Sequence, residues 1–217
     1  MKTIKVTGTG QIRRRPDRTR ITLTLEGVSP EYGEAIRRSA EATEQLKDLI
    51  EARGIARSEL KTLDFNIDTE YEGYEENGIY KQRFAGYRFR HLTKVEFDAD
   101  SDLLGRLLSA FARCPAKPEF RISFTVKDPE AAKTALLGNA VADAKAKAEA
   151  LAKAAGVRLG AIRRIDYSRA GIDLEVRPVN RLMMAKDCSE ATGSLALDVE
   201  PDDVTASDTV TILWEIE

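Results

Sequence analysis

Apolar and polar residues alternate along several stretches of the chain, and alternation with a period of two is typical of strands that bury one face. In the clearest case, Ile21, Leu23 and Leu25 alternate with threonines. The same pattern predicts strands at residues 3–7, 63–67, 87–97, 122–126, 162–167, 195–199 and 210–216. We therefore expect a chain that is rich in half-buried strands.

Apolar residues at helical spacing predict helices between these strands. The first helix covers residues 30–54 and is expected to end in a left-handed cap at Gly54. Its apolar stripe consists of Ile36, Leu46, Leu49 and Ile50. A short second helix is expected over residues 101–113, before Cys114-Pro115.

The third predicted helix, residues 129–155, is long and rich in alanine, and Asp128-Pro129 is typical of a helix start. Its apolar seam is spaced alternately by four and three residues: Leu137, Val141, Ala144, Ala148, Leu151 and Ala155. Small side chains on such a seam allow another surface to approach closely. This seam is therefore a candidate packing surface and one reason to expect self-association.

Part of the sequence is repeated with an offset of 102 residues, as from Leu49 to Leu151. The first copy contains Gly54-Ile55, Leu60 and Leu63-Asp64-Phe65, and the second contains Gly156-Val157, Ile162 and Ile165-Asp166-Tyr167. Each copy is predicted to form a strand, a helix that ends at a glycine, and another strand. This similarity predicts an internal duplication.

Together these patterns predict an α+β protein of duplicated β-α-β-β units, with a mainly antiparallel sheet, two long helices packed on it and one short helix. We expect residues 1–217 to form a single domain with internal duplication. Its approximate halves are residues 1–99 and 117–217, joined by a short helical connection over residues 100–116.

Aromatic residues gather around Asn77-Gly78, a dipeptide typical of hairpin turns, in a ribbon or loop longer than a minimal turn. These residues are Tyr71, Tyr74, Tyr80, Phe84 and Tyr87. Tyrosine is enriched in protein interfaces, so the ribbon is a candidate contact surface. The alternative is that half of these rings pack on the protein's own sheet.

A second candidate contact lies at Met183 and Met184, in an irregular stretch from about residue 170 to 193. Methionine side chains are flexible and suit adaptable contacts. A disordered or self-packed insertion is the alternative for this stretch.

Composition narrows the classes of function. The chain has 34 lysine and arginine residues against 36 acidic residues, a net charge of −2, so it has no broad field to attract nucleic acid. No stretch is long and apolar enough to insert into a membrane, and the N-terminus lacks the apolar core of a signal peptide. With only two cysteines, a cytoplasmic location is expected. A periplasmic protein whose signal peptide had been removed would look the same.

Candidate catalytic residues are few. His91 is the single histidine and lies on the apolar side of its strand, which favours a structural role. Cys114 precedes a proline and is expected to be buried, whereas Cys188 is the better candidate for redox chemistry. Gly8-Thr9-Gly10 lacks the third glycine of a nucleotide loop and is expected to be a strand bend. The sequence therefore predicts no catalytic, metal or cofactor-binding residue.

Several segments form a distinctive set: residues 4–10 with Pro16-Asp17, Gly86-Tyr87 at the opening of a strand, residues 140–144 leading to 154–160, and the final hairpin from Pro201 to Trp214. Together these segments resemble the SIMPL-domain family. The resemblance spans nearly the whole chain. It implies a domain of unknown function, found in exported bacterial proteins, some linked to oxidative stress and one assembled into a ring. An animal member is a signalling adaptor, and the family implies no catalytic residue.

These observations favour a non-enzymatic, self-associating scaffold or interaction protein, related to a stress response and forming a homo-oligomer. The alternative is a protein that binds a small apolar or anionic ligand between its helices and its sheet. An enzyme ranks third, because it would need His91 or Cys188 beside a carboxylate in a cleft.

Overall fold

The computed structural model describes residues 2–167, 172, 174–177 and 201–217. The chain divides into two compact units. Among the described residues, unit 1 contains 2–17, 124–167, 172, 174–176 and 201–217, and unit 2 contains 18–123 and 177, so the second unit interrupts the first along the chain. Met183, Met184, Cys188 and the predicted strand at 195–199 lie outside the described residues.

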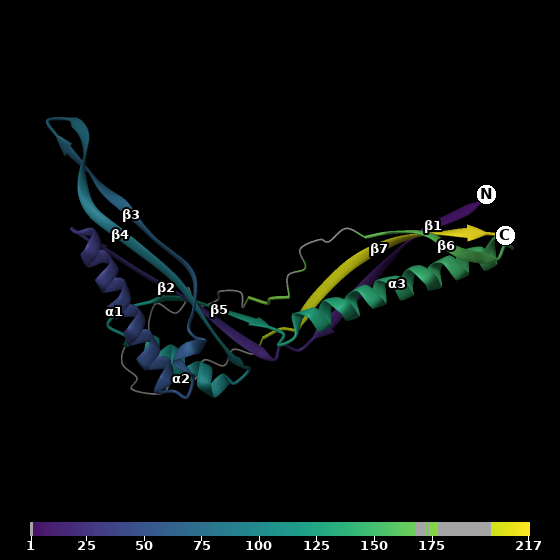
Figure 1. Ribbon diagram of the computed structural model, residues 1–217, viewed down its shortest axis with the longest axis horizontal. Helices are drawn as coiled ribbons and strands as arrows, with labels where there is room; N and C mark the ends of the chain where they lie inside the picture. The colour runs from purple at the N-terminus through teal and green to yellow at the C-terminus, as the bar shows by residue number, and fades with distance from the viewer. Residues whose placement is uncertain (1, 168–171, 173, 178–200) are drawn as a thin grey trace. The chain divides into compact units, whose positions relative to one another are not determined.

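The α+β class is confirmed, and the described strands divide between two sheets (Figure 1). In chain order, the elements are β1 (Thr3–Arg14), β2 (Arg18–Ser29), α1 (Tyr32–Glu51), a 3-10 turn (Arg57–Glu59), β3 (Lys61–Glu76), β4 (Ile79–Asp98), α2 (Ser101–Phe111), β5 (Glu119–Thr125), α3 (Pro129–Ala154), β6 (Leu159–Asp166) and β7 (Val204–Ile216). One sheet has the order β1-β7-β6 and the other β3-β4-β2-β5. The strand pairs β1–β7, β6–β7, β2–β4 and β3–β4 are all antiparallel.

In unit 1, α3 packs along β1 and β7 (Figure 1). Its buried residues recur every fourth position: Ala132, Leu136, Ala140, Ala144, Ala148 and Ala152. The predicted seam is therefore wrong except at Ala144 and Ala148, and Val141 and Leu151 are exposed. A four-residue repeat advances by about 40° around a helix at each step. The buried line therefore winds around α3 as the strands pass along it.

The approach of β1 to α3 depends on glycine. A Cβ atom on Gly8 would lie 2.1 Å from the carbonyl oxygen of Ala140, and one on Gly10 would lie 2.1 Å from that of Leu136. No real side chain tolerates such distances. The two glycines therefore serve direct packing of a strand on a helix backbone, which differs from the strand bend expected for this segment.

A hydrogen bond also holds β1 against α3. The backbone N–H of Thr9 donates a hydrogen bond to Asp143 Oδ2 at 2.7 Å, and Lys147 Nζ donates to the same oxygen at 2.7 Å. The hydrogen bonds from Lys147 and then from Thr9 lower the pKa of Asp143. Because β1 is an edge strand, this carboxylate satisfies a strand N–H that no neighbouring strand could reach.

Unit 2 has the element order β2-α1-β3-β4-α2-β5, and its sheet order β3-β4-β2-β5 is that of a ferredoxin-like split β-α-β arrangement. Helix α1 packs against β2 and β4. The sheet buries Ile21, Leu23 and Leu25 from β2 and Phe89, Val95 and Phe97 from β4. The helix buries Ala35, Ser39, Leu46 and Ile50. Ile36, expected in the buried stripe, is exposed because it lies on the flank of α1.

The two long helices end in the same way. Gly54 has φ 86° and donates to the Glu51 carbonyl, and Ile55 N–H returns to the Ile50 carbonyl at 3.1 Å. Gly156 has φ 72°, and Val157 N–H returns to the Ala152 carbonyl at 3.0 Å. These are Schellman caps, so the left-handed exit predicted at Gly54 is confirmed. The duplication itself stays a prediction.

A methyl group at Gly8 should destabilise unit 1, because the atoms it would meet belong to the backbone of α3. We expect Gly8→Ala to lower the free energy of unfolding by about 1–3 kcal/mol. Urea titration followed by the fluorescence of Trp214, the single tryptophan, measures this change inside unit 1.

Gly138→Ala is the matched control on α3. A Cβ atom at Gly138 meets nothing within 4 Å. Alanine should therefore raise stability by roughly 0.5–1 kcal/mol through helix propensity. Equal effects of the two substitutions would contradict the close-approach explanation.

Candidate functional site

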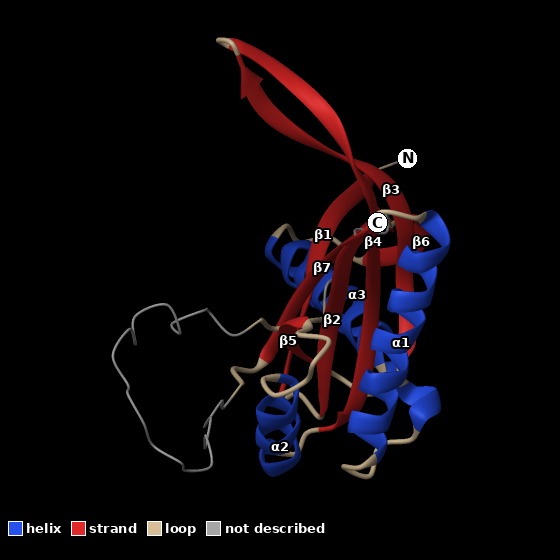
Figure 2. Ribbon diagram, turned by 90° about the vertical axis from the view of Figure 1, so that its left-hand side faces the viewer, coloured by secondary structure: helices blue, strands red, loops and turns tan. Residues whose placement is uncertain are grey.

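The hairpin of β3 and β4 extends beyond the rest of its sheet (Figure 2). Strand β2 pairs with β4 only as far as Tyr87, opposite Ser29, whereas β3 and β4 remain paired to Glu76 and Ile79. Asn77 and Gly78 have φ 55° and 74°, which a two-residue type I′ turn requires. The expected ribbon is therefore present, and its turn is minimal rather than long.

One face of this ribbon is aromatic. The rings of Tyr71 and Phe84 lie 5.9 Å apart, those of Phe84 and Tyr87 5.3 Å apart, and Tyr87 meets Tyr32 of α1 at 5.5 Å, all edge-to-face. Tyr80 continues this face toward the tip and is 74% exposed. Its hydroxyl lies over Gly73, where a Cβ atom would come within 1.9 Å of it.

The opposite face of the ribbon is charged. Arg83 donates to Glu72 at 2.9 Å and lies over the Tyr74 ring at 6.0 Å. Lys81 pairs with Glu76 close to the turn. Tyr74 is thus separated from the four other predicted interface residues, because β-strand side chains alternate between faces.

The aromatic face continues into a groove between α1 and β3, in a hollow of about 460 Å³. Phe65 and Ile36 line it and are 45% and 44% exposed. We define the aromatic surface by its five exposed rings: Tyr32, Phe65, Tyr71, Tyr80 and Phe84. Tyr32 and Phe65 were missed in the sequence because neither stands near the Asn77-Gly78 turn signal. The pairing of β3 with β4 beside α1 is what brings them to the ribbon.

His91 lies at the floor of this groove with both ring nitrogens satisfied. Thr43 Oγ1 donates to the Ser39 carbonyl at 2.8 Å, so it accepts from His91 Nδ1 at 3.0 Å. A neutral ring then accepts from Thr62 Oγ1 at Nε2, at 2.9 Å. Burial, and then the charge of Lys47, lower the pKa of His91. The residue is therefore held as a neutral member of the core.

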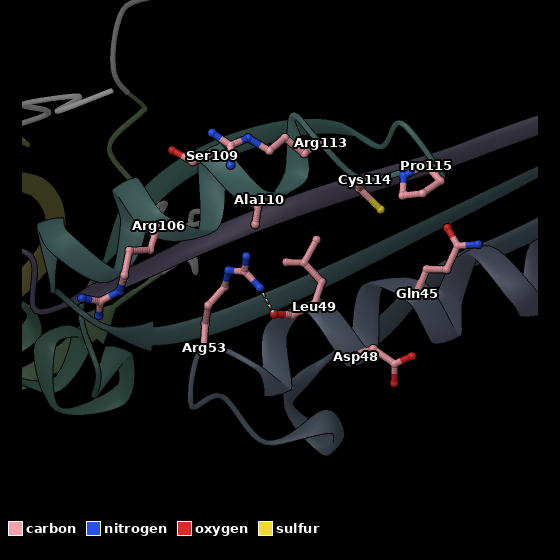
Figure 3. Close-up of a pocket in the computed structure, with 10 residues that line it drawn as sticks. All are labelled: Gln45, Asp48, Leu49, Arg53, Arg106, Ser109, Ala110, Arg113, Cys114 and Pro115. Atoms are coloured by element: carbon pink, nitrogen blue, oxygen red, sulfur yellow. Dashed lines mark hydrogen bonds between the residues drawn. The ribbon is translucent and has the colours of Figure 1, made fainter. Parts of the chain in front are cut away.

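A second hollow, of about 470 Å³, lies between α1 and α2 (Figure 3). Leu49, Ala110, Cys114 and Pro115 supply its apolar lining, and Arg53, Arg106 and Arg113 are the basic residues around it. Figure 3 shows Arg53 rising from the end of α1 and donating to the Leu49 carbonyl, at 2.9 Å. This group could not be predicted from the sequence, because its members meet only when α1 and α2 pack together.

The other residues considered for chemistry do not form a common site. Cys114 is a free, buried thiol in the lining of the second hollow, and Gly8-Thr9-Gly10 belongs to β1 in unit 1. Among the described residues, no three His, Cys, Asp or Glu side chains are grouped closely enough to hold a metal ion. No helix in the described part of the chain has the length and apolar character needed to cross a membrane.

The fold defines an α+β protein with two antiparallel sheets and a protruding hairpin that exposes aromatic rings. The model of the SIMPL family, described as a protein of unknown function (DUF541), matches residues 4–214. This chain therefore belongs to the SIMPL family. No curated protein matches its sequence.

Solved structures give only remote similarity. CutA from Synechococcus elongatus is 14% identical, over 59% of this chain and 94% of that chain, with a TM-score of 0.22. CutA1, a divalent ion tolerance protein from Ehrlichia chaffeensis, is 12% identical over 58% and 96%, with a TM-score of 0.21. An uncharacterised conserved protein from Listeria innocua is 10% identical over 96% and 92%, with a TM-score of 0.26. TM-scores this low do not establish a shared fold.

The lowered pKa of His91 predicts a pH-dependent stability. The unfolded chain binds a proton at His91 near the ordinary pKa of 6.5, and the folded chain binds it only at lower pH. Stability should therefore be full above pH 6.5 and fall as the pH drops below it, by less than about 1.4 kcal/mol per pH unit. Urea titrations between about pH 7.5 and 5.5, above the range of most carboxylates, measure this slope.

His91→Gln is the control, because glutamine keeps hydrogen-bonding capacity and does not titrate. The variant should lose the slope in this pH window. A slope that persists unchanged in His91→Gln would assign it to other groups.

Proposed function

We propose that this protein is a non-enzymatic interaction module that self-associates through the aromatic surface. The main support for this proposal is that the rings of the aromatic surface are exposed to solvent. Tyr71 is 56% and Tyr80 74% exposed, although rings of this size are usually buried in a partner or a core. Tyrosines at the centre of contact surfaces often dominate their binding energy.

The extent of the surface suits a dimer contact. The five rings expose roughly 550 Å² together, taking about 200 Å² for each aromatic side chain. A standard interface buries about 800 Å² on each partner, including a polar rim. The aromatic surface therefore supplies most of one side of such an interface.

The charges on the ribbon favour a second copy of this chain as the partner. The charged face neutralises itself through Arg83 with Glu72 and Lys81 with Glu76, and so requires no partner of opposite charge. The remaining face offers rings with few charges among them. A surface of the same kind on a second copy is its chemical complement, in the isologous contact typical of symmetric dimers.

Strand edges are poorly suited to this contact. Strand β3 is at the edge of its sheet and carries Asp64, Asp68, Glu70, Glu72, Glu75 and Glu76. Two such edges would bring like charges together, which natural sheets use to prevent edge-to-edge pairing. The contact we propose is therefore face to face.

Removing two rings should dissociate the assembly. We expect Tyr80→Ser with Phe84→Ser to weaken self-association by roughly 100-fold or more, since central aromatic residues each contribute about 2 kcal/mol. Sedimentation velocity and light scattering over a concentration series measure the change. Circular dichroism verifies that the fold is retained.

Tyr74→Ser is the matched control on the opposite face of the same ribbon, and it should leave the association constant within about tenfold of the original. A wild-type protein that stays strictly monomeric at its highest soluble concentration would overturn the proposal. So would equal weakening by the control.

A further inference from the structure

We infer that the hollow between α1 and α2 binds a small organic oxyanion, a phosphate or carboxylate carried on a compact apolar body. Its volume of about 470 Å³ is within the range of small-molecule sites, roughly 300–1,000 Å³. The apolar lining would hold the body of the ligand. The surrounding arginines would hold its charged group.

The charge balance of the hollow supports this ligand class. Three arginines line it, against one carboxylate, Asp48. Asp48 is paired with Arg57, which also binds Glu44 and Glu51. Arginines therefore outnumber carboxylates by three to one in the lining of the hollow.

Two of these arginines have no partner within the described part of the chain. The side chains of Arg106 and Arg113 make no hydrogen bond or ion pair there, whereas the Arg53 side chain uses one N–H on the Leu49 carbonyl. Guanidinium groups present a rigid fork of donors that matches the oxygens of a carboxylate or phosphate. Both side chains are exposed at the rim of the hollow, so their donors are accessible to an anion that enters from solution.

Helix dipoles explain only part of this arrangement. Cations are favoured at helix C-termini, and Arg53 beside the last turn of α1 fits that role through its bond to a helix carbonyl. Arg106 lies in the middle of α2, and the side chain of Arg113 bonds to no carbonyl in the described chain. These two side chains are left for another anion.

Isothermal titration calorimetry with phenyl phosphate and with phthalate tests the site and separates the two sources of oxyanion. We expect one molecule of at least one probe to bind per chain. Benzamide, which is uncharged, should not bind, and inorganic phosphate should bind at least tenfold more weakly because it leaves the apolar lining empty. Absence of binding by both organic anions would overturn the inference.

The substitution Arg106→Gln tests whether this side chain binds the ligand. It removes no hydrogen bond or ion pair within the described part of the chain. It should raise the Kd at least about tenfold, the effect of one charged hydrogen bond. Arg37→Gln, an exposed arginine on α1 outside the hollow, is the matched control and should leave the Kd unchanged. Equal affinity in wild type and Arg106→Gln would overturn the assignment. The titration does not depend on self-association, which the ribbon variants test separately.

Discussion

A single helix covers only about two strands of a sheet, and this limit governs the surface of both units. A helix is about 10 Å across with its side chains, and neighbouring strands lie about 4.8 Å apart. Helix α1 lies on β2 and β4, and α3 lies on β1 and β7. Each sheet therefore has an edge strand, β3 or β6, whose helix-side residues are covered only in part by the long helix.

The apolar residues of these edge strands show the consequence. On β3, Phe65 is opposite His91 and is exposed beside α1. On β6, Ile162 and Ile165 are opposite the buried Trp214 and Ile212, yet both are exposed. Because directly paired residues point to the same face, these side chains lie on the helix side of their sheets. Contact surfaces arise here from incomplete covering of a core face.

Local sequence signals were enough to predict most helices and strands. Features that depend on contacts between residues far apart in the sequence could not be predicted. The start of α3 could be predicted because its cap is a local interaction: Asp128 accepts from the Ala131 N–H. The buried line of α3 could not, because Gly8 and Gly10 select it from more than a hundred residues away. The division into two sheets also depends on which strands pair, and a period of two does not specify a partner. The arginine hollow required two helices to meet.

The packing of α3 also changes the basis for self-association. Its line of small residues suggested a surface open to another molecule, but β1 of the same chain occupies that line. Small residues on a helix therefore indicate a close approach without identifying the neighbour. The proposed self-association therefore rests on the aromatic ribbon, whose acidic edge favours a contact through the face that carries the rings. A stress-related role and a cytoplasmic location stay predictions, since neither depends on a contact within the described chain.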